Sequence, residues 1–311
     1  MPTETAIARN THADFFATDD FLELALTSSN GKLKLQPPVF CVDGATVSPT
    51  RFVTVTDAYP VFGHVKEQVA TFGFGDDLPH LRLEVVVRSV YDSPVLRFCY
   101  RLVCDKPVSL TKPDGVETLS YFTLDFSRVN DYGETITAKE MRFAEFNALF
   151  HSFMLHETPL ATPDFVAERS VVGPFLILKS PNAPNGLVAY EHGSQSNDPF
   201  LTYDLHPNGT TATLRAVKGN YWHNQTITPG EPWESLWFQI ALTDGDEDKL
   251  AHDYRTWVLQ HQSPNIASRK PYLFYNTWNY QERVKASQKR PYLADMNEAR
   301  MLSEIDRKSV V

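Results

Sequence analysis

The chain has 311 residues, of which 42% are hydrophobic and 22% are charged, and its formal net charge is −9. This length allows one large domain or two of ordinary size, and the composition is that of a globular protein. The acidic balance, without any basic stripe, excludes nucleic acid as the expected partner. No apolar run approaches the roughly 18 residues that a membrane span needs, so no membrane partner is expected either.

The N-terminus and the cysteines indicate a compartment. No basic segment followed by an apolar one opens the chain, so we expect no secretory signal. The three cysteines Cys41, Cys99 and Cys104 are an odd and sparse set, which suits a reducing environment better than a disulfide framework. The sequence therefore predicts a cytoplasmic protein.

Alternating patterns predict that residues 1–243 are mainly β. Residues 81–88 and 96–103 alternate apolar with charged side chains, and a turn sequence at 91–94 separates them, so the pair predicts a hairpin. Segments rich in Pro, Gly and Asn separate further expected strands at 119–126, 175–179, 187–191, 211–217 and 236–242. We expect one large antiparallel β-sandwich, or supersandwich, over residues 1–243.

The pattern changes at Asp244, where acidic residues suited to a helix N-terminus begin. Apolar and aromatic positions then recur at helical spacing, namely Leu250, Tyr254, Trp257, Val258 and His261. They predict an amphipathic helix of about four turns that ends before Pro264. Residues 244–269 are therefore predicted to be a helix and a linker.

Residues 270–305 predict the first β/α unit of a second domain. Residues 270–279 form an expected buried strand whose end is polar and aromatic, and residues 293–305 form an amphipathic segment. One strand and one helix are the opening of a (β/α)₈ barrel, which needs eight such units to close. We expect the chain to hold the start of an incomplete TIM barrel, so that the barrel is truncated.

The last six residues, 306–311, have an unusual origin in our interpretation. They are what a common sequencing adapter encodes, and the next adapter codon is a stop. We interpret them as an adapter-derived tail on a gene fragment. The alternative is a genuine short basic tail.

The first candidate site is the end of the expected barrel strand, where Asn276, Trp278 and Asn279 lie. Active sites of such barrels sit at the carboxyl ends of the strands. Trp278 offers a flat apolar face for a sugar ring, and the two asparagines offer paired donors and acceptors. These three residues are the expected substrate-binding residues. The alternative, equally open, is that Trp278 only fills the interface between sandwich and barrel.

Other polar segments carry weaker signals. Residues 220–226 are either a binding loop or, as we favour, the edge of a strand. Residues 190–198 place Ser and His next to each other, which is poor geometry for a catalytic triad. The acid pairs at 19–20 and 76–77 are expected in solvated loops, and the ten histidines show no metal-ligand spacing. We therefore expect no metal and no cofactor.

Several of these segments resemble glycoside hydrolase family 36, the bacterial α-galactosidases and their relatives. The resembling segments are residues 59–63, 191–195, 221–225 and 270–278. The resemblance implies an N-terminal β-supersandwich, a helix and a catalytic barrel, with Trp278 lining the sugar pocket. It also implies that the catalytic aspartates lie on later barrel strands, so no catalytic residue falls within this chain.

Two departures from the family pattern leave the sugar open. The family often has an acidic residue shortly after the 59–63 segment, where this chain has His64, Val65 and Lys66. The acidic residue expected after Trp278 is replaced by Asn279. The resemblance thus implies a retaining α-galactosidase-like glycosidase for terminal α-galactosides, with an α-N-acetylgalactosaminidase or another α-glycosidase as alternatives.

Three functions follow for the chain as given. The first is an inactive N-terminal fragment of this glycosidase, whose full-length form binds a carbohydrate substrate. The second is a non-catalytic carbohydrate-binding module. The third is a structural sandwich that supports homo-oligomerisation, with its tryptophans in cores and interfaces, which is their commoner use.

Overall fold

The computed structural model describes residues 4–112, 119–129, 136–147, 152–162, 165–166, 173–191, 201–206, 209–216, 224–263, 265, 267, 270, 285–289, 291 and 297–309. Contacts divide the chain into two units, residues 1–264 and residues 265–311. Within the described parts, no helix is both long and apolar enough to cross a membrane.

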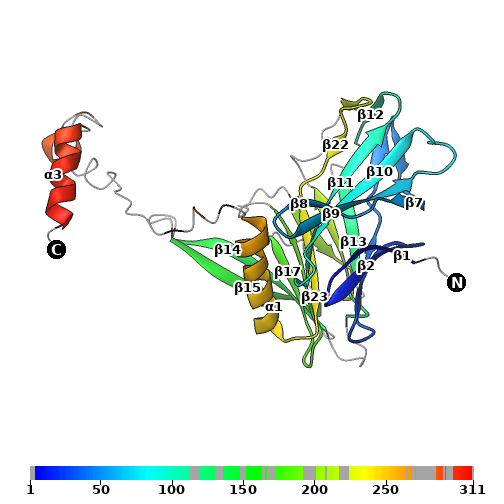
Figure 1. Ribbon diagram of the computed structural model, residues 1–311, viewed down its shortest axis with the longest axis horizontal. Coiled ribbons are helices and arrows are strands. Elements are labelled where there is room, and N and C mark those ends of the chain that lie inside the picture. The colour runs from blue at the N-terminus through cyan, green and yellow to red at the C-terminus, as the bar shows by residue number, and fades with distance from the viewer. Residues whose placement is uncertain are drawn as a thin grey trace. The chain divides into compact units, whose positions relative to one another are not determined.

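The described strands of the first unit form three antiparallel sheets (Figure 1). The seven-stranded sheet has the order β1 (Thr5–Arg9), β2 (Ala13–Thr18), β3 (Phe21–Leu26), β4 (Lys32–Gln36), β13 (Leu119–Asp125), β20 (Thr211–Ala216) and β19 (Leu201–Leu205). A four-stranded sheet has the order β21 (Gln225–Ile227), β12 (Val108–Leu110), β5 (Phe40–Val42) and β6 (Ala45–Val47).

The largest sheet has twelve strands. Its main path runs β16 (Phe165–Val166), β15 (Ser152–Thr162), β14 (Thr137–Asn147), β17 (Phe175–Lys179), β18 (Asn185–Tyr190), β23 (Phe238–Thr243), β11 (Val95–Cys104), β10 (Leu81–Ser89), β9 (Val65–Gly73) and β7 (Arg51–Val55). Two short strands pair beside this path, β22 (Trp233–Glu234) on β11 and β8 (Tyr59–Phe62) on β9.

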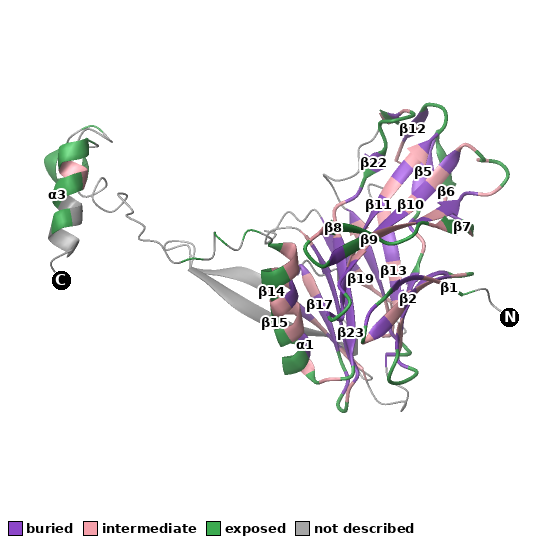
Figure 2. Cartoon of the chain, viewed as in Figure 1, coloured by how far each residue is buried: buried purple, intermediate pink, exposed green. Residues whose placement is uncertain are grey.

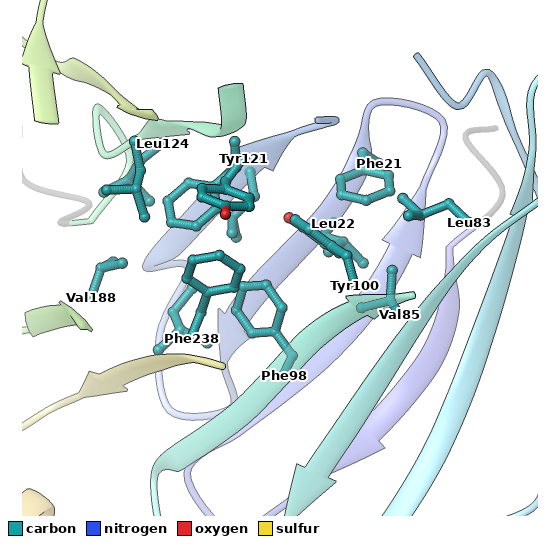
Figure 3. Close-up of a cluster of buried hydrophobic side chains, with 14 of the residues drawn as sticks. Phe21, Leu22, Leu83, Val85, Phe98, Tyr100, Tyr121, Leu124, Val188 and Phe238 are labelled. Carbon is teal, nitrogen blue, oxygen red and sulfur yellow. The ribbon is translucent and has the colours of Figure 1, made fainter. Parts of the chain in front are cut away.

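The two large sheets pack face to face around an aromatic core (Figure 3). Phe238 of β23 meets Tyr121 and Phe122 of β13, with ring centroids 5.1 and 5.3 Å apart. Phe21 of β3 meets Phe72 of β9 at 4.7 Å. Burying each such ring contributes roughly 2–3 kcal/mol, so this core is the main source of stability.

A helix covers the opposite face of the twelve-stranded sheet. Helix α1 (Glu247–Trp257) packs Leu250 and Trp257 against a second apolar cluster that includes residues of β17, β18 and β23. Asp246 caps the helix by accepting a hydrogen bond from the Lys249 amide at 2.9 Å. Figure 2 shows buried residues along the strands, whereas α1 keeps an exposed side.

Ion pairs fix the start of α1 to the sheet. Glu247 binds Lys139 of β14 at 2.5 Å and Lys179 of β17 at 2.6 Å. Partial burial raises the pKa of Glu247, but the hydrogen bonds from both lysines outweigh this and hold the pKa below its usual value. The helix therefore meets the sheet through both apolar and charged contacts.

The last turn of the helix differs from the prediction. A π-helical segment, η1 (Val258–Gln262), follows α1, and the Ser263 amide bonds to the Val258 carbonyl at 3.1 Å. The predicted helix is present, but its end is wider than a regular α-helix.

The predicted mainly-β antiparallel fold is confirmed, although several strands were not predicted. The expected hairpin forms from β10 and β11, with Leu81 opposite Cys104 and Arg88 opposite Arg97. The strands expected near β13, β17, β18, β20 and β23 also form, with ends shifted by a few residues. Strands β1 to β9 had no counterpart in the prediction.

The second unit is described only in short pieces. Helix α3 (Glu298–Ser309) begins after Asn297, whose side chain accepts from the Arg300 amide at 3.0 Å. It starts later than the amphipathic segment predicted at 293–305 and includes residues 306–309. The expected barrel strand at 270–279 lies outside the described residues, except for Lys270, so the barrel stays a prediction.

Tyr100 provides a test of the core. Its fully buried hydroxyl, labelled in Figure 3, has no hydrogen-bond partner among the described residues. Removing an unpaired buried polar group costs nothing, so Tyr100→Phe should leave the free energy of unfolding unchanged or raise it by about 1 kcal/mol. Urea unfolding followed by tryptophan fluorescence measures this.

The matched control is Tyr203, also fully buried, whose hydroxyl donates to the Val188 carbonyl at 3.5 Å. Tyr203→Phe should cost roughly 0.5–1 kcal/mol. A loss at Tyr100 as large as the loss at Tyr203 would contradict this account of the core.

Candidate functional surface

The predicted substrate-binding residues Asn276, Trp278 and Asn279 all lie outside the described residues, so that site stays a prediction. The segment 220–226 is described from Asn224 onward. Its residues Gln225 and Thr226 belong to β21, which pairs with β12, and this agrees with the strand-edge alternative. The acid pair at 19–20 forms the turn between β2 and β3.

The most elaborate polar arrangement in the described part is a row across the outer face of the twelve-stranded sheet. Here the outer face is the one that α1 covers. Successive cross-strand partners on five neighbouring strands form this outer row, namely Tyr59, Glu67, Arg88, Arg97 and Gln239. These strands span some 180 residues of sequence, so the row exists only in the folded sheet.

Two arginines face each other within the outer row. Arg88 and Arg97 are direct cross-strand partners, and like charges in that position are destabilising. Both guanidinium groups lie over the ring of Trp237, with centroid distances of 4.5 Å and 4.1 Å. The electron-rich ring attracts both cations, so Trp237 reduces the cost of their proximity.

Two carboxylates neutralise the charges of Arg88 and Arg97. Glu67 accepts from Arg88 Nε at 2.7 Å and also bonds the hydroxyl of Tyr59. Glu191 holds Arg97 with two hydrogen bonds of 2.5 and 2.7 Å. The Glu67 bond and its charge, with some burial, raise the pKa of the Tyr59 hydroxyl.

Glu191 is the residue where the row meets the helix. Besides Arg97, it accepts from Gln239 of β23 at 2.6 Å and from Gln262 of η1 at 2.8 Å. Tyr254 of α1 donates to Gln239 at 2.7 Å. Burial, together with the nearby Glu191 charge, raises the pKa of Tyr254 far above its usual value, so this hydroxyl remains a donor at physiological pH.

This arrangement is suited to holding elements together rather than to glycoside hydrolysis. A retaining glycosidase needs two carboxyl groups free to act on a substrate, about 5 Å apart. Glu67 and Glu191 are instead bound to arginines and are 12% and 24% exposed. In the parts that the structure describes, no cluster of three His, Cys, Asp or Glu side chains could hold a metal ion.

The described tryptophans are also poor platforms for a sugar. Trp233 and Trp257 are buried, at 3% and 4% exposure. The ring of Trp237 already carries two guanidinium groups. The prediction that tryptophans of the sandwich serve cores and contacts therefore agrees with the geometry of these three residues.

From the sequence, Trp237 is expected only as a core or interface tryptophan, and nothing indicates Gln262 as part of this surface. One signal was available for the arginines, because the predicted hairpin around residues 91–94 already places Arg88 opposite Arg97. Tyr59 and Glu191 belong to segments that resemble family 36 enzymes. Of their bonds, the one from Tyr59 to Glu67 joins neighbouring strands, whereas the one from Arg97 to Glu191 depends on the register of strands distant in sequence.

Comparison of the sequence with protein-family profiles and with curated proteins gives no significant match. Solved structures do match. The galactosidase domain of the α-galactosidase-sucrose kinase AgaSK has a TM-score of 0.57 at 8% identity, over 85% of this chain and 44% of that chain.

Two further α-galactosidases are similar in the same way. One is a variant of the family 36 enzyme AgaA from Geobacillus stearothermophilus in complex with raffinose, with a TM-score of 0.57 at 9% identity, over 92% of this chain and 48% of that chain. The other is the α-galactosidase from Lactobacillus brevis, with a TM-score of 0.51 at 8% identity. The match covers 83% of this chain and 42% of that chain. The chain thus has the fold of the N-terminal sandwich domain of family 36 α-galactosidases, and it spans less than half of their length.

Trp237 provides a test of the outer row. Trp237→Leu should lower the free energy of unfolding by on the order of 1–2 kcal/mol, because Arg88 and Arg97 lose the ring that attracts both of their guanidinium groups. Chemical denaturation measures the change. High salt should reduce the difference between variant and wild type, since salt screens the repulsion between the arginines.

Tyr91, which is 71% exposed, is the control residue. Tyr91→Leu should change the stability by less than about 0.5 kcal/mol at any salt concentration. An equally small effect at Trp237 would show that the arginines do not need the ring.

His261 provides a test of pH dependence. Its ring lines a small cavity with Trp257, Asp92 and Ser93. Burial lowers the pKa of His261 from its usual 6.5, while Asp92 opposes this shift and nearby His64 adds to it. The unfolded chain therefore binds this proton more tightly, so the wild type should lose stability as the pH falls through about 6.

His261→Gln removes the group that takes up this proton. The free energy of unfolding of the variant should therefore fall less than that of the wild type between about pH 7.5 and pH 5. Thermal unfolding at both pH values measures the difference. The exposed His252 of α1 is the control residue, and His252→Gln should follow the wild type. Equal losses of stability in the wild type and in His261→Gln would contradict the claim that burial lowers the pKa of His261.

Proposed function

We propose that this chain is the N-terminal part of a longer retaining α-glycosidase that resembles the family 36 α-galactosidases. The observation that carries the proposal is the shared fold, which covers 85% to 92% of this chain but only 44% to 48% of two solved α-galactosidase structures. In this proposal the sandwich, residues 1–243, and the helix and linker, residues 244–269, support a catalytic domain that begins at residue 270.

The polar groups of the sandwich support this division of roles. The carboxylates of Glu67 and Glu191 bind arginines, and the described tryptophans are buried or covered by cations. Hydrolysis through a covalent glycosyl-enzyme needs one carboxylate as nucleophile and another as acid. In the proposed enzyme both come from barrel strands beyond this chain, so the chain as given is inactive.

For the substrate we propose a terminal α-galactoside. The AgaA variant that shares this fold was solved with raffinose, and the residues that resemble the family include Trp278. In the proposed enzyme, Trp278 stacks on the sugar ring at the end of the first barrel strand, while Asn276 and Asn279 bond its hydroxyls. The proposed enzyme works in the cytoplasm without a cofactor.

A second candidate function is support of homo-oligomerisation. Apolar side chains are exposed on the edge strands β7 and β8, where Val53, Tyr59 and Val61 are 50%, 44% and 40% exposed. Exposed apolar groups at a sheet edge favour contact with another protein surface. Light scattering on the purified chain tests this second candidate. If the chain is a monomer at micromolar concentration, support of homo-oligomerisation is excluded.

A chromogenic α-galactoside tests the proposed function. The purified chain should release no chromophore above the buffer rate, because it lacks both catalytic carboxylates. Isothermal titration with galactose and raffinose should likewise give no heat of binding. Turnover would contradict the proposed division of roles, and measurable affinity without turnover would support a carbohydrate-binding module instead.

A further inference from the structure

Glu191, which binds Arg97 of the outer row, also contacts the segment where the chain leaves the sandwich unit. Gln262 is the last residue of η1, and the first unit ends two residues later, at position 264. Gln262 donates to the Glu191 carboxylate at 2.8 Å. The contact joins positions 71 residues apart in sequence, so it fixes the end of the helix to a distant part of the sheet.

Glu191 is itself rigidly held. Two bonds to Arg97 form a bidentate pair, which is the strongest geometry for a carboxylate and a guanidinium group. The Glu191 amide also donates to the Trp237 carbonyl at 2.9 Å, which fixes the backbone. Gln262 therefore binds an acceptor whose position is set by β11, β18 and β23.

The π turn brings Gln262 into position for this bond. In a regular α-helix, Gln262 would lie roughly 140° around the axis from Trp257, which faces the sheet. A π turn is wider, with i→i+5 hydrogen bonds, so it brings Gln262 closer to the side of the helix on which Trp257 lies. The Ser263-to-Val258 hydrogen bond shows the wide turn directly, and Leu259 is left 44% exposed.

From these contacts we propose that Glu191 is a positioning residue that holds the π turn η1 closed through Gln262. It thereby fixes the end of the helical segment to the sheet, up to Ser263. This local role does not depend on the proposed function.

Hydrogen exchange measured by mass spectrometry on the whole chain tests the proposal. Glu191→Gln removes the charge and the bidentate pair, so amides of residues 258–263 should exchange on the order of tenfold faster. Gln262→Leu removes only the helix side of the contact. It should give the same local acceleration while the urea midpoint of the whole chain stays unchanged.

The matched control is Glu234, which pairs with Arg101 on the same face at 3.2 Å and is 44% exposed. Glu234→Gln should leave the exchange of residues 258–263 unchanged. The proposal is overturned if both test variants exchange like the wild type in this segment. It is also overturned if exchange rises equally along α1, because Glu191 would then support the fold in general.

The outcome is separate from that of the galactoside assay. Unchanged exchange would remove the positioning role but leave the proposed glycosidase intact. Turnover by this chain would contradict the proposed function and leave the local role of Glu191 as measured.

Discussion

The structure depends on covering the outer face of the twelve-stranded sheet. Its central strands β18 and β23 are buried along all six of their residues, so neither face can be left to solvent. The inner face packs on the seven-stranded sheet. The outer face is covered by α1 over β18 and β23, and by long arginine side chains and Trp237 over β10 and β11, where Val86 and Cys99 are 1% and 0% exposed.

The helical segment and the arginines that cover this face meet at Glu191, which bonds both Gln262 and Arg97. Covering a sheet with arginines requires counter-charges, and Glu67 and Glu191 provide them. Because these two carboxylates are occupied by arginines, neither is suited to acid–base catalysis. Its polar residues connect strands and helix, which is consistent with a supporting domain and with a proposed active site elsewhere in a longer enzyme.

The sequence predicted the elements with long periodic runs, whereas the short alternating strands β2 and β4 were missed. Residues 81–88 and 96–103 alternate because one side of each strand lies in the core, and Leu250 and Trp257 recur because α1 has one buried face. β7 was missed because it is largely exposed, so its residues show no clear alternation. Apart from the Arg88–Arg97 pair of the hairpin, the outer row could not be predicted, since it depends on the register of strands distant in sequence. The sugar-binding role of Trp278 stays a prediction.

The central claim is that the sandwich, with its helical cover, is a complete folding unit that ends with η1. The most direct test compares the urea unfolding of residues 1–263 with that of the whole chain. The account predicts the same free energy of unfolding within about 0.5 kcal/mol, because both faces of the sheet are covered by residues before Pro264. Loss of cooperative unfolding in the shorter chain would contradict it.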